Sequence, residues 1–172
     1  MIEGDLLALR SRDRKRSARS LLYEAMFQSL RGTSNQAFSL RLVERAREYF
    51  GADLSSADET SLALVRGGIA VQASEFHEGL RYLSQAKDRL SQRLTERSWE
   101  LDTSYWILGF TNFYLGNFRF LNQDVQSVIE DAERRNDHYL SSNLRLSHFA
   151  HGRLMQQPAA EVRREVVSAN NL

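Results

Sequence analysis

Histidine spacing gives the first candidate for chemistry in this chain. His148 and His151 lie three residues apart, which puts two imidazoles on one face of a helix, where they could share a metal ion. The other two histidines, His77 and His138, lack the paired Glu-x-x-His motifs of helical di-metal sites. We therefore interpret all four as structural or surface residues and expect no metal site.

An acidic patch is the second candidate. Glu130, Asp131 and Glu133 could be read as paired carboxylates for general acid and base catalysis. Arg134 and Arg135 follow directly, and charges of both signs are ordinary near the C-terminus of a helix. We interpret the patch as helix chemistry, and we expect no catalytic residue and no cofactor.

A basic cluster near the N-terminus is the third candidate. Its members are Arg10, Arg12, Arg14, Lys15, Arg16 and Arg19. One interpretation is a nucleic-acid adaptor that contacts phosphates. The other is a solvated turn over 10–16 whose arginines pair with nearby acids. No aromatic platform interleaves with the cluster and the net charge is only +1, so we favour the turn.

The composition is that of a soluble helical protein. The 172 residues are 42% apolar and 26% charged, with one proline and nine glycines. The absence of cysteine excludes disulfides and fits a reducing compartment. The acidic first residues do not resemble a signal peptide, and no apolar run is long enough to cross a membrane. We expect a cytoplasmic location and no membrane partner.

Apolar residues recur at spacings of three and four, which predicts helices throughout. The expected helices are 2–10, 17–30, 36–50, 56–74, 77–97, 99–115, 118–134, 138–156 and one that starts near Pro158. Ser55 or Ser56 is placed to cap the helix over 56–74, and Glu59 would complete a capping box with Ser56. Ser98 is placed to cap the helix over 99–115.

Two stretches repeat one apolar pattern 42 residues apart. Leu64, Gly67, Val71, Phe76, Leu83, Ala86 and Leu90 are followed by Trp106, Gly109, Phe113, Phe118, Val125, Val128 and Ala132. A fixed period of this length is typical of stacked helical hairpins. Small residues recur at one crossing position, where stacked hairpins need close approach: Ala25, Gly67, Gly109 and Ser147.

These patterns predict an all-α fold, a right-handed stack of antiparallel helical hairpins of the tetratricopeptide-like α-solenoid type. We expect one domain over 1–172, with three full hairpins and an incomplete fourth. Stacked hairpins leave a concave polar surface. Its candidate partner-binding residues are Arg66, Gln72, Asn112 and Arg145. The exposed ends of a short stack are a further surface, through which the protein could self-associate.

The helix over 99–115 is apolar on nearly every side, which predicts a central position. Its aromatic residues could form the core between hairpins or a pocket for a small ligand. A closed cavity lined by Trp106 and Phe113 would favour the second interpretation, a ligand-binding or enzymatic protein. A continuous groove would favour a peptide-binding module.

Part of the second stretch resembles a tetratricopeptide repeat. Trp106, the pair Leu108-Gly109 and the turn Gly116-Asn117-Phe118 stand where that motif has its aromatic, its Leu-Gly and its turn glycine. Leu121 stands where the motif has alanine, and the period of 42 exceeds the usual 34. Longer helices of the tetratricopeptide-like class fit this period better.

Five strings occur in order between residues 19 and 145, within a wider similarity over about residues 14–168. They are Arg19-Ser-Leu-Leu-Tyr-Glu-Ala, Trp99-Glu-Leu-Asp-Thr, Tyr114-Leu-Gly, Glu130-Asp-Ala-Glu-Arg-Arg-Asn-Asp-His-Tyr and Ser142-Asn-Leu-Arg. The chain resembles the C-terminal helical-repeat region of large multidomain bacterial serine/threonine protein kinases. In those proteins a kinase domain and a signalling-type ATPase domain precede the repeats. Kinase and phosphate-loop motifs are absent from this sequence.

The resemblance implies a non-catalytic regulatory scaffold in kinase signalling, with a protein or peptide partner such as a kinase or ATPase domain. It also implies that the chain is part of, or derived from, such a kinase. Asp102 and Arg145 lie in two of these strings, on helices that should be neighbours. We predict that they pair and so fix the stacking.

Overall fold

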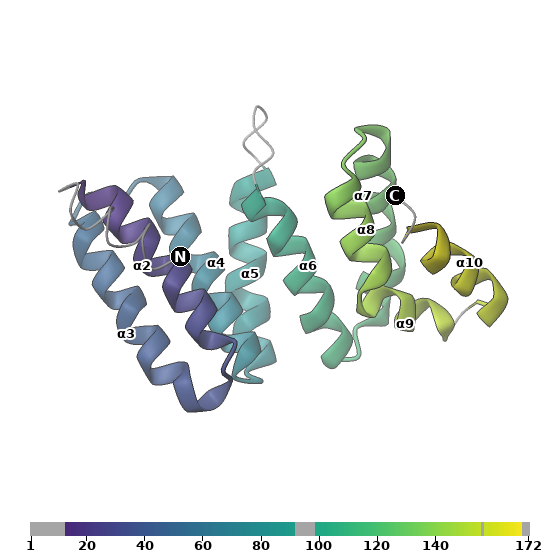
Figure 1. Ribbon diagram of the computed structural model, residues 1–172, viewed down its shortest axis with the longest axis horizontal. Helices are drawn as coiled ribbons and strands as arrows, with labels where there is room; N and C mark the ends of the chain where they lie inside the picture. Colours follow the sequence, from purple (N-terminus) through teal and green to yellow (C-terminus); the bar gives the residue numbers. More distant parts are fainter. Residues whose placement is uncertain (1–12, 92–98, 156, 170–172) are drawn as a thin grey trace. The chain divides into compact units, whose positions relative to one another are not determined.

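The computed structural model describes residues 13–91, 99–155 and 157–169 (Figure 1). Within these ranges every element is a helix, so the fold class is all-α. The helix expected over 2–10 and the cap expected at Ser98 lie outside the described residues. The chain separates into two compact units, residues 1–100 and 101–172, called here the N-terminal and C-terminal units. The single domain and the solenoid stack stay predictions.

The N-terminal unit consists of two antiparallel helix pairs. Helix α2 (Arg14–Ser29) pairs with α3 (Thr33–Phe50), and α4 (Ser56–Gln72) pairs with α5 (Phe76–Ser91) (Figure 1). Helix α4 also packs against both α2 and α3. The shared core contains Ala18, Leu22, Ala25, Val43, Ala46, Phe50, Leu62, Val65 and Ile69. Ala25, expected at a close crossing, is fully buried there.

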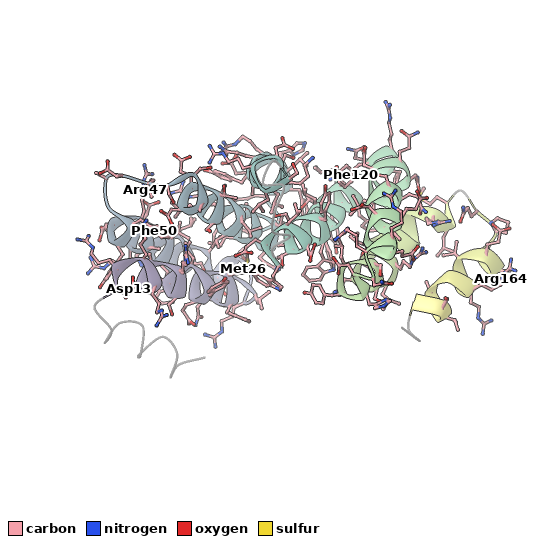
Figure 2. The ribbon with its side chains drawn as sticks, turned by 90° about the horizontal axis from the view of Figure 1, so that it is seen from above. Asp13, Met26, Arg47, Phe50, Phe120 and Arg164 are labelled. Carbon is pink, nitrogen blue, oxygen red and sulfur yellow. The ribbon has the colours of Figure 1, made fainter. Side chains whose placement is uncertain are left out.

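Two helix starts differ from the expectation. Helix α2 begins at Arg14 and not at residue 17, because Asp13 (Figure 2) caps it by accepting a hydrogen bond from the Arg16 amide at 3.1 Å. The expected turn over 10–16 is therefore wrong from Arg14 onward. In α4 the capping box joins Ser55 and Asp58, one position before the predicted pair.

Glycines let α4 and α5 approach each other closely. A Cβ atom at Gly67 would lie 2.6 Å from Leu83 Cγ, and one at Gly79 would lie 2.6 Å from Val71 Cγ2. Both distances are too short for real contacts, so the packing of this pair requires glycine at both positions. The close approach predicted at Gly67 is confirmed, whereas sequence reasoning missed Gly79.

The C-terminal unit takes most of α6 (Trp99–Tyr114) and all later helices. These are the π-helical turn η1 (Phe120–Asp124), α7 (Val125–Arg134), α8 (His138–Leu146), α9 (His148–Leu154) and α10 (Ala159–Ala169). The core consists of Leu121, Val125, Ile129, Ala132, Leu140 and Leu144. Five partly buried apolar side chains pack against this core: Tyr105, Phe113, Phe118, Phe120 and Val128.

Two helices expected to be regular are interrupted. The helix over 118–134 contains η1, and the helix over 138–156 breaks at Ser147, whose backbone is extended (φ −86°, ψ −164°). The Ser147 hydroxyl donates to the Leu144 carbonyl at 3.0 Å. Serine side chains compete in this way with the helical hydrogen-bond pattern.

The expected repeat positions of the C-terminal unit have mixed outcomes. Gly116 forms the predicted turn with a φ of +70°, a conformation that favours glycine. Phe118 packs on the core as expected. Trp106, by contrast, is 40% exposed, and a Cβ atom at Gly109 would meet no described atom within 4 Å. Trp106 therefore lacks the packing role that the repeat pattern predicts, and Gly109, although buried, shows no close approach among the described atoms.

Candidate functional site

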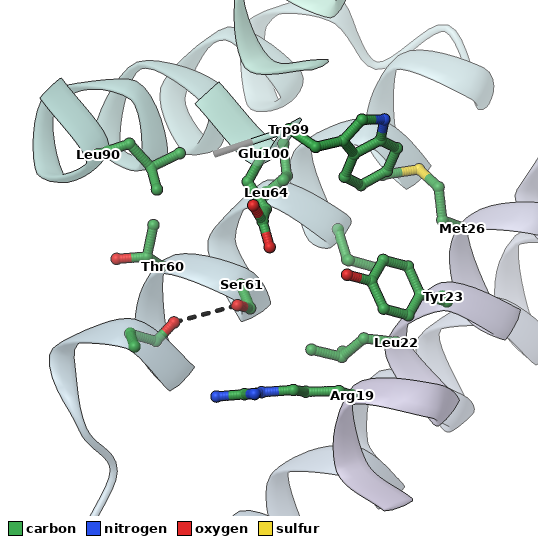
Figure 3. A pocket seen from close by; sticks show the side chains of 12 residues that line it. Arg19, Leu22, Tyr23, Met26, Thr60, Ser61, Leu64, Leu90, Trp99 and Glu100 are labelled. Carbon is green, nitrogen blue, oxygen red and sulfur yellow. Dashed lines mark hydrogen bonds between the residues drawn. The ribbon is translucent and has the colours of Figure 1, made fainter. Parts of the chain in front are cut away.

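An open hollow of about 240 Å³ lies in the N-terminal unit (Figure 3). Helices α2 and α4 form two of its walls, and the end of α5 and the first residues of α6 complete it. It is lined by Arg19, Leu22, Tyr23, Met26, Ala57, Thr60, Ser61, Leu64, Val65, Leu90, Trp99 and Glu100. Most of these side chains are apolar, so the hollow suits an apolar group.

Two exposed aromatic rings stand at the rim of the hollow. The Tyr23 and Trp99 ring centroids are 6.0 Å apart, with 59° between the ring planes. Tyr23 is 44% exposed and Trp99 49%, whereas Leu22 and Leu64 are buried in the floor. Half-exposed tyrosine and tryptophan over an apolar floor are typical of anchor sites in protein interfaces.

The hydroxyl groups of the floor are engaged within α4. Thr60 Oγ1 donates to the Ser56 carbonyl at 2.6 Å, and Ser61 Oγ donates to the Ala57 carbonyl at 3.1 Å, as the dashed line in Figure 3 shows. Since each hydroxyl donates its proton to its own helix, the floor offers an incoming ligand little polar recognition.

The rim carries both signs of charge. Arg19 and Glu100 line the hollow together with Tyr23 (Figure 3). Burial raises the pKa of the Tyr23 phenol above its ordinary value, the Glu100 carboxylate raises it further, and Arg19 opposes the shift. The phenol therefore stays protonated at neutral pH and can donate a hydrogen bond.

The structure places two predicted partner-binding residues of α4 away from this hollow. Arg66 forms an ion pair with Glu44 of α3 and donates to the Tyr82 hydroxyl of α5 at 3.4 Å. Gln72 is exposed at the end of α4. Neither residue lines the hollow beside Tyr23 and Trp99.

Arg66 and Tyr82 instead line two other hollows, of about 190 and 300 Å³, between α3 and α5. Several polar and charged groups there pair with one another. Arg89 contacts Glu59 at 3.0 Å, and Gln36 donates to Glu75 at 2.9 Å. We therefore regard this face as a structural network rather than as the candidate site.

The expectation for Asn112 is wrong. Its side chain is only 1% exposed, so it offers no surface for a partner. Asn112 Nδ2 donates to the Leu108 carbonyl at 2.8 Å, and Asn112 Oδ1 accepts from Asn117 Nδ2 at 2.8 Å. The residue thus stabilises the turn after α6, because it occupies the helix face that turns inward there.

Arg145 binds within the C-terminal unit. Its guanidinium donates to Glu133 Oε1 from Nη2 at 2.7 Å and from Nε at 3.0 Å. This contact joins α8 to the end of α7. The predicted pair of Asp102 and Arg145 stays a prediction.

The described part of the basic cluster has structural contacts. Arg14 donates to the carbonyls of Tyr49 at 3.2 Å and Glu48 at 3.0 Å, at the C-terminal end of α3. Lys15 Nζ lies 3.8 Å from the buried Asp58 carboxylate. Cations near the last carbonyls of a helix stabilise it. Arg10 and Arg12 lie outside the described residues.

The other candidates for chemistry show no reactive cluster in the described parts of the chain. In the acidic patch, Asp131 pairs with Arg134 at 3.2 Å and with Arg135 at 3.1 Å, as expected for helix chemistry. No group of three or more potential metal ligands occurs among the residues described. The side chains of His148 and His151 are not among these.

The aromatic residues of α6 divide between two roles. Phe113 packs on the C-terminal core, and its ring centroid lies 6.3 Å from that of Phe118. The ring centroids of Trp106 and Phe110 are 5.2 Å apart. Neither Trp106 nor Phe113 lines the 240 Å³ hollow. Its aromatic wall comes from Trp99, at the start of the same helix.

The described residues form an all-helical chain with an open, mainly apolar hollow in its N-terminal unit. No family model, curated protein or solved structure matches the chain. Among the residues that the structure describes, no helix is long and apolar enough to cross a membrane.

Proposed function

We propose that the protein is a non-catalytic interaction module that binds a peptide segment of a partner protein in the 240 Å³ hollow of its N-terminal unit. The observation that carries the proposal is the half-exposed pair of Tyr23 and Trp99 above a buried apolar floor. Exposed aromatic residues beside a pocket are the usual anchors of binding energy in protein interfaces.

The volume of the hollow favours a side chain over a whole small molecule. Pockets for small-molecule ligands usually measure about 300–1,000 Å³. At about 240 Å³, and open to solvent, the hollow fits one aromatic or branched apolar side chain. The alternative is that the hollow binds a small molecule, and the experiment must distinguish this from peptide binding.

The rim charges indicate which residues of the partner peptide flank its anchor, the apolar side chain that enters the hollow. Arg19 favours an acidic residue on one side of the anchor, and Glu100 favours a basic residue on the other. The partner segment is therefore an apolar anchor between charges of opposite sign.

We further propose that the partner protein belongs to kinase signalling. This proposal is supported by the resemblance to helical-repeat regions of bacterial serine/threonine kinases, in which strings 19–25 and 99–103 supply the aromatic and charged residues of the hollow. The partner would then be a segment of a kinase or ATPase domain, in the cytoplasm. A tetratricopeptide-like stack is part of the same proposal, since such stacks present peptide-binding faces.

The experiment uses the two tryptophans of the chain as reporters. In Trp106→Phe, Trp99 is the single tryptophan, so its fluorescence reports on the hollow. Peptides selected from a random display library against the full chain are titrated into this variant. We expect saturable changes in Trp99 emission, and selected sequences that share an apolar anchor between an acid and a base.

Matched variants complete the test. Trp99→Ala should weaken peptide binding about tenfold or more, whereas Trp106→Ala, which removes a similarly exposed tryptophan of α6, should leave it unchanged. Peptides that bind equally to both variants would contradict the proposal. Saturation by free indole or toluene as tight as by any peptide would favour the small-ligand alternative.

Self-association is a separate question. Leu154, Met155 and Val167 of the C-terminal unit are half-exposed or more. Sedimentation of the full chain at increasing concentration decides whether such apolar residues join two copies.

A further inference from the structure

Helix α2 carries apolar residues on two opposite sides. One side faces the core through residues such as Leu22 and Ala25, where α3 and α4 cover it. The opposite side carries Tyr23, Phe27 and the C-cap residue Leu30, which are 44%, 46% and 60% exposed. A surface helix normally has polar residues opposite its core side. The folding of the N-terminal unit therefore does not account for these outward apolar residues.

Two arginines continue the same line toward the start of the helix. Arg16 and Arg19 precede Tyr23 by seven and four residues, so they lie on the same helix face, and both are exposed. Neither guanidinium forms an ion pair within the part of the chain that the structure describes. Arg16, Arg19, Tyr23, Phe27 and Leu30 are called here the α2 stripe. It is basic at one end and apolar at the other.

The α2 stripe is continuous with the 240 Å³ hollow. Arg19 and Tyr23 belong to both, as they also line the hollow (Figure 3). The ring of Trp99, at the rim, lies 6.0 Å from the ring of Tyr23. A partner segment that places its anchor in the hollow therefore lies against the stripe as well.

The spacing of the stripe fits a helix as the partner segment. From Arg16 to Leu30 the stripe covers four helical turns, about 21 Å at a rise of about 1.5 Å per residue. A partner helix that lies along α2 has the same pitch, so its own residues at spacings of three and four meet those of the stripe in turn. Recognition of an amphipathic helix through anchors at such spacings is a common binding mode.

We propose that the partner segment is an amphipathic helix of about four turns, acidic at one end and apolar at the other, that packs along the α2 stripe. Its acidic residues face Arg16 and Arg19, and its apolar residues cover Phe27 and Leu30, because complementary charge and apolar contact then coincide. The inference rests on the proposed function, since the same helix supplies the anchor that enters the hollow.

The probe is a synthetic, fluorescein-labelled peptide of about 15 residues, rich in alanine. It carries glutamates one and two turns before a central phenylalanine, and leucines one and two turns after it. Fluorescence anisotropy with the full chain measures its affinity, and we expect saturable binding. A peptide with lysines in place of the glutamates, and one with a proline beside the phenylalanine, should each bind about tenfold more weakly or less, because they lose the charge match or the helix.

Matched variants of the chain locate the binding surface. Phe27→Ala should weaken the probe about tenfold, whereas Phe38→Ala, which truncates a phenylalanine of α3 that is 40% exposed, should leave it unchanged. Arg16→Gln should weaken the probe, and Arg41→Gln, at an exposed arginine of α3, should not. All four positions are exposed, and an unchanged thermal midpoint confirms that each variant is folded.

The outcomes separate this inference from the proposed function. If Trp99→Ala weakens the selected peptides but Phe27→Ala and Arg16→Gln do not, the hollow binds a peptide without the stripe and the inference is wrong. If Phe27→Ala and Arg16→Gln weaken the probe and Trp99→Ala does not, the stripe binds the helix and the proposed role of the hollow fails instead.

Other occupants of the stripe would also overturn the inference. Self-association of the full chain that Phe27→Ala abolishes would assign the stripe to a second copy. Nuclear Overhauser effects between the Phe27 ring and the Leu6 methyl groups would assign it to the chain's own residues 2–10. Binding to anionic lipid vesicles that the probe does not displace would assign it to a membrane surface.

Discussion

Two stretches that share one sequence pattern are packed in different ways. The α4/α5 pair of the N-terminal unit approaches closely at Gly67 and Gly79. In the C-terminal unit, Gly109 of α6 occupies the position of Gly67, yet a Cβ atom there would meet no described atom within 4 Å. The same glycine is thus required in one stretch and tolerated in the other.

The difference follows from two neighbouring positions. Val71 contacts the Cβ position of Gly79 in the α4/α5 pair. The residues 42 positions later are Phe113 and Leu121, which pack in the same core. A phenylalanine and a leucine need more room than a valine and a glycine, so Gly109 cannot have the close contact of Gly67.

A repeat in sequence thus predicts helices and their order better than it predicts the distance between them. Helix separation depends on side-chain volume at the contact. In the C-terminal unit the small residue at the contact is on a different helix, because the Cβ position of Gly152 in α9 lies 3.3 Å from Leu121 Cδ1.

The largest loss of stability is expected from truncating Leu121, the buried side chain that keeps the helices of the C-terminal unit apart and is called here the spacer. Leu121→Ala truncates a fully buried side chain, and we expect it to lower the free energy of unfolding by about 2–5 kcal/mol. Urea unfolding followed by circular dichroism measures it. Leu146→Ala, which truncates a leucine that is 45% exposed, is the control and should change stability by about 0.5 kcal/mol or less. An equal loss in both variants would mean that Leu121 is not a spacer.

Alanine at the two equivalent glycines should have effects of opposite sign. Gly67→Ala forces Leu83 to move, a cost of about 1–3 kcal/mol that exceeds the helix-propensity gain of about 1 kcal/mol. Gly109→Ala gains the propensity without a clash and should stabilise the protein by about 0.5–1 kcal/mol. The same urea experiment checks both variants. Changes of the same sign would show that the two stretches pack alike.

The smallest effect concerns a polar contact that only the α4/α5 pair has. Arg66 donates to the Tyr82 hydroxyl and lowers the pKa of that phenol, whereas burial raises the pKa of Tyr23. Tyr82 should therefore ionise before Tyr23 in a ¹³C NMR titration. Arg66→Leu, which introduces the residue type found at the equivalent Leu108, should raise the pKa of Tyr82 toward its ordinary value near 10.

The sign of the effect on stability differs between these two tyrosines. Between the lowered pKa of Tyr82 and its unfolded value, the unfolded chain binds more protons, so Tyr82 increases stability as the pH rises. Above the unfolded value of Tyr23, the folded chain binds more protons, so Tyr23 decreases stability. A Tyr82 titration that Arg66→Leu leaves unchanged would contradict the assigned contact.

Local patterns predicted most of the helices, because spacing of apolar residues and turn glycines act over a few residues. The turn at Gly116 and the crossing at Gly67 are examples. The π turn and the break at Ser147 were not predicted, since each depends on hydrogen bonds that compete with a regular helix.

The candidate site was predicted less well than the helices. Asn112 was expected to be exposed on the concave face of the stack, but its side chain is buried and bonded to the turn after α6. Tyr23 and Trp99 are 76 positions apart in sequence, and no local pattern shows that their rings meet. Only the packing of α2 beside α4 and the position of the first residues of α6 bring them together.

The contact of Arg14 with the end of α3 has a consequence for how the first helix pair opens. A short loop joins α2 and α3 at one end, and the Arg14 guanidinium ties the first turn of α2 to the carbonyls of Glu48 and Tyr49 at the other. Because the pair is connected at both ends, separating the two helices at either end requires one of these connections to open. Their backbone amides should therefore exchange with solvent together, in one cooperative opening.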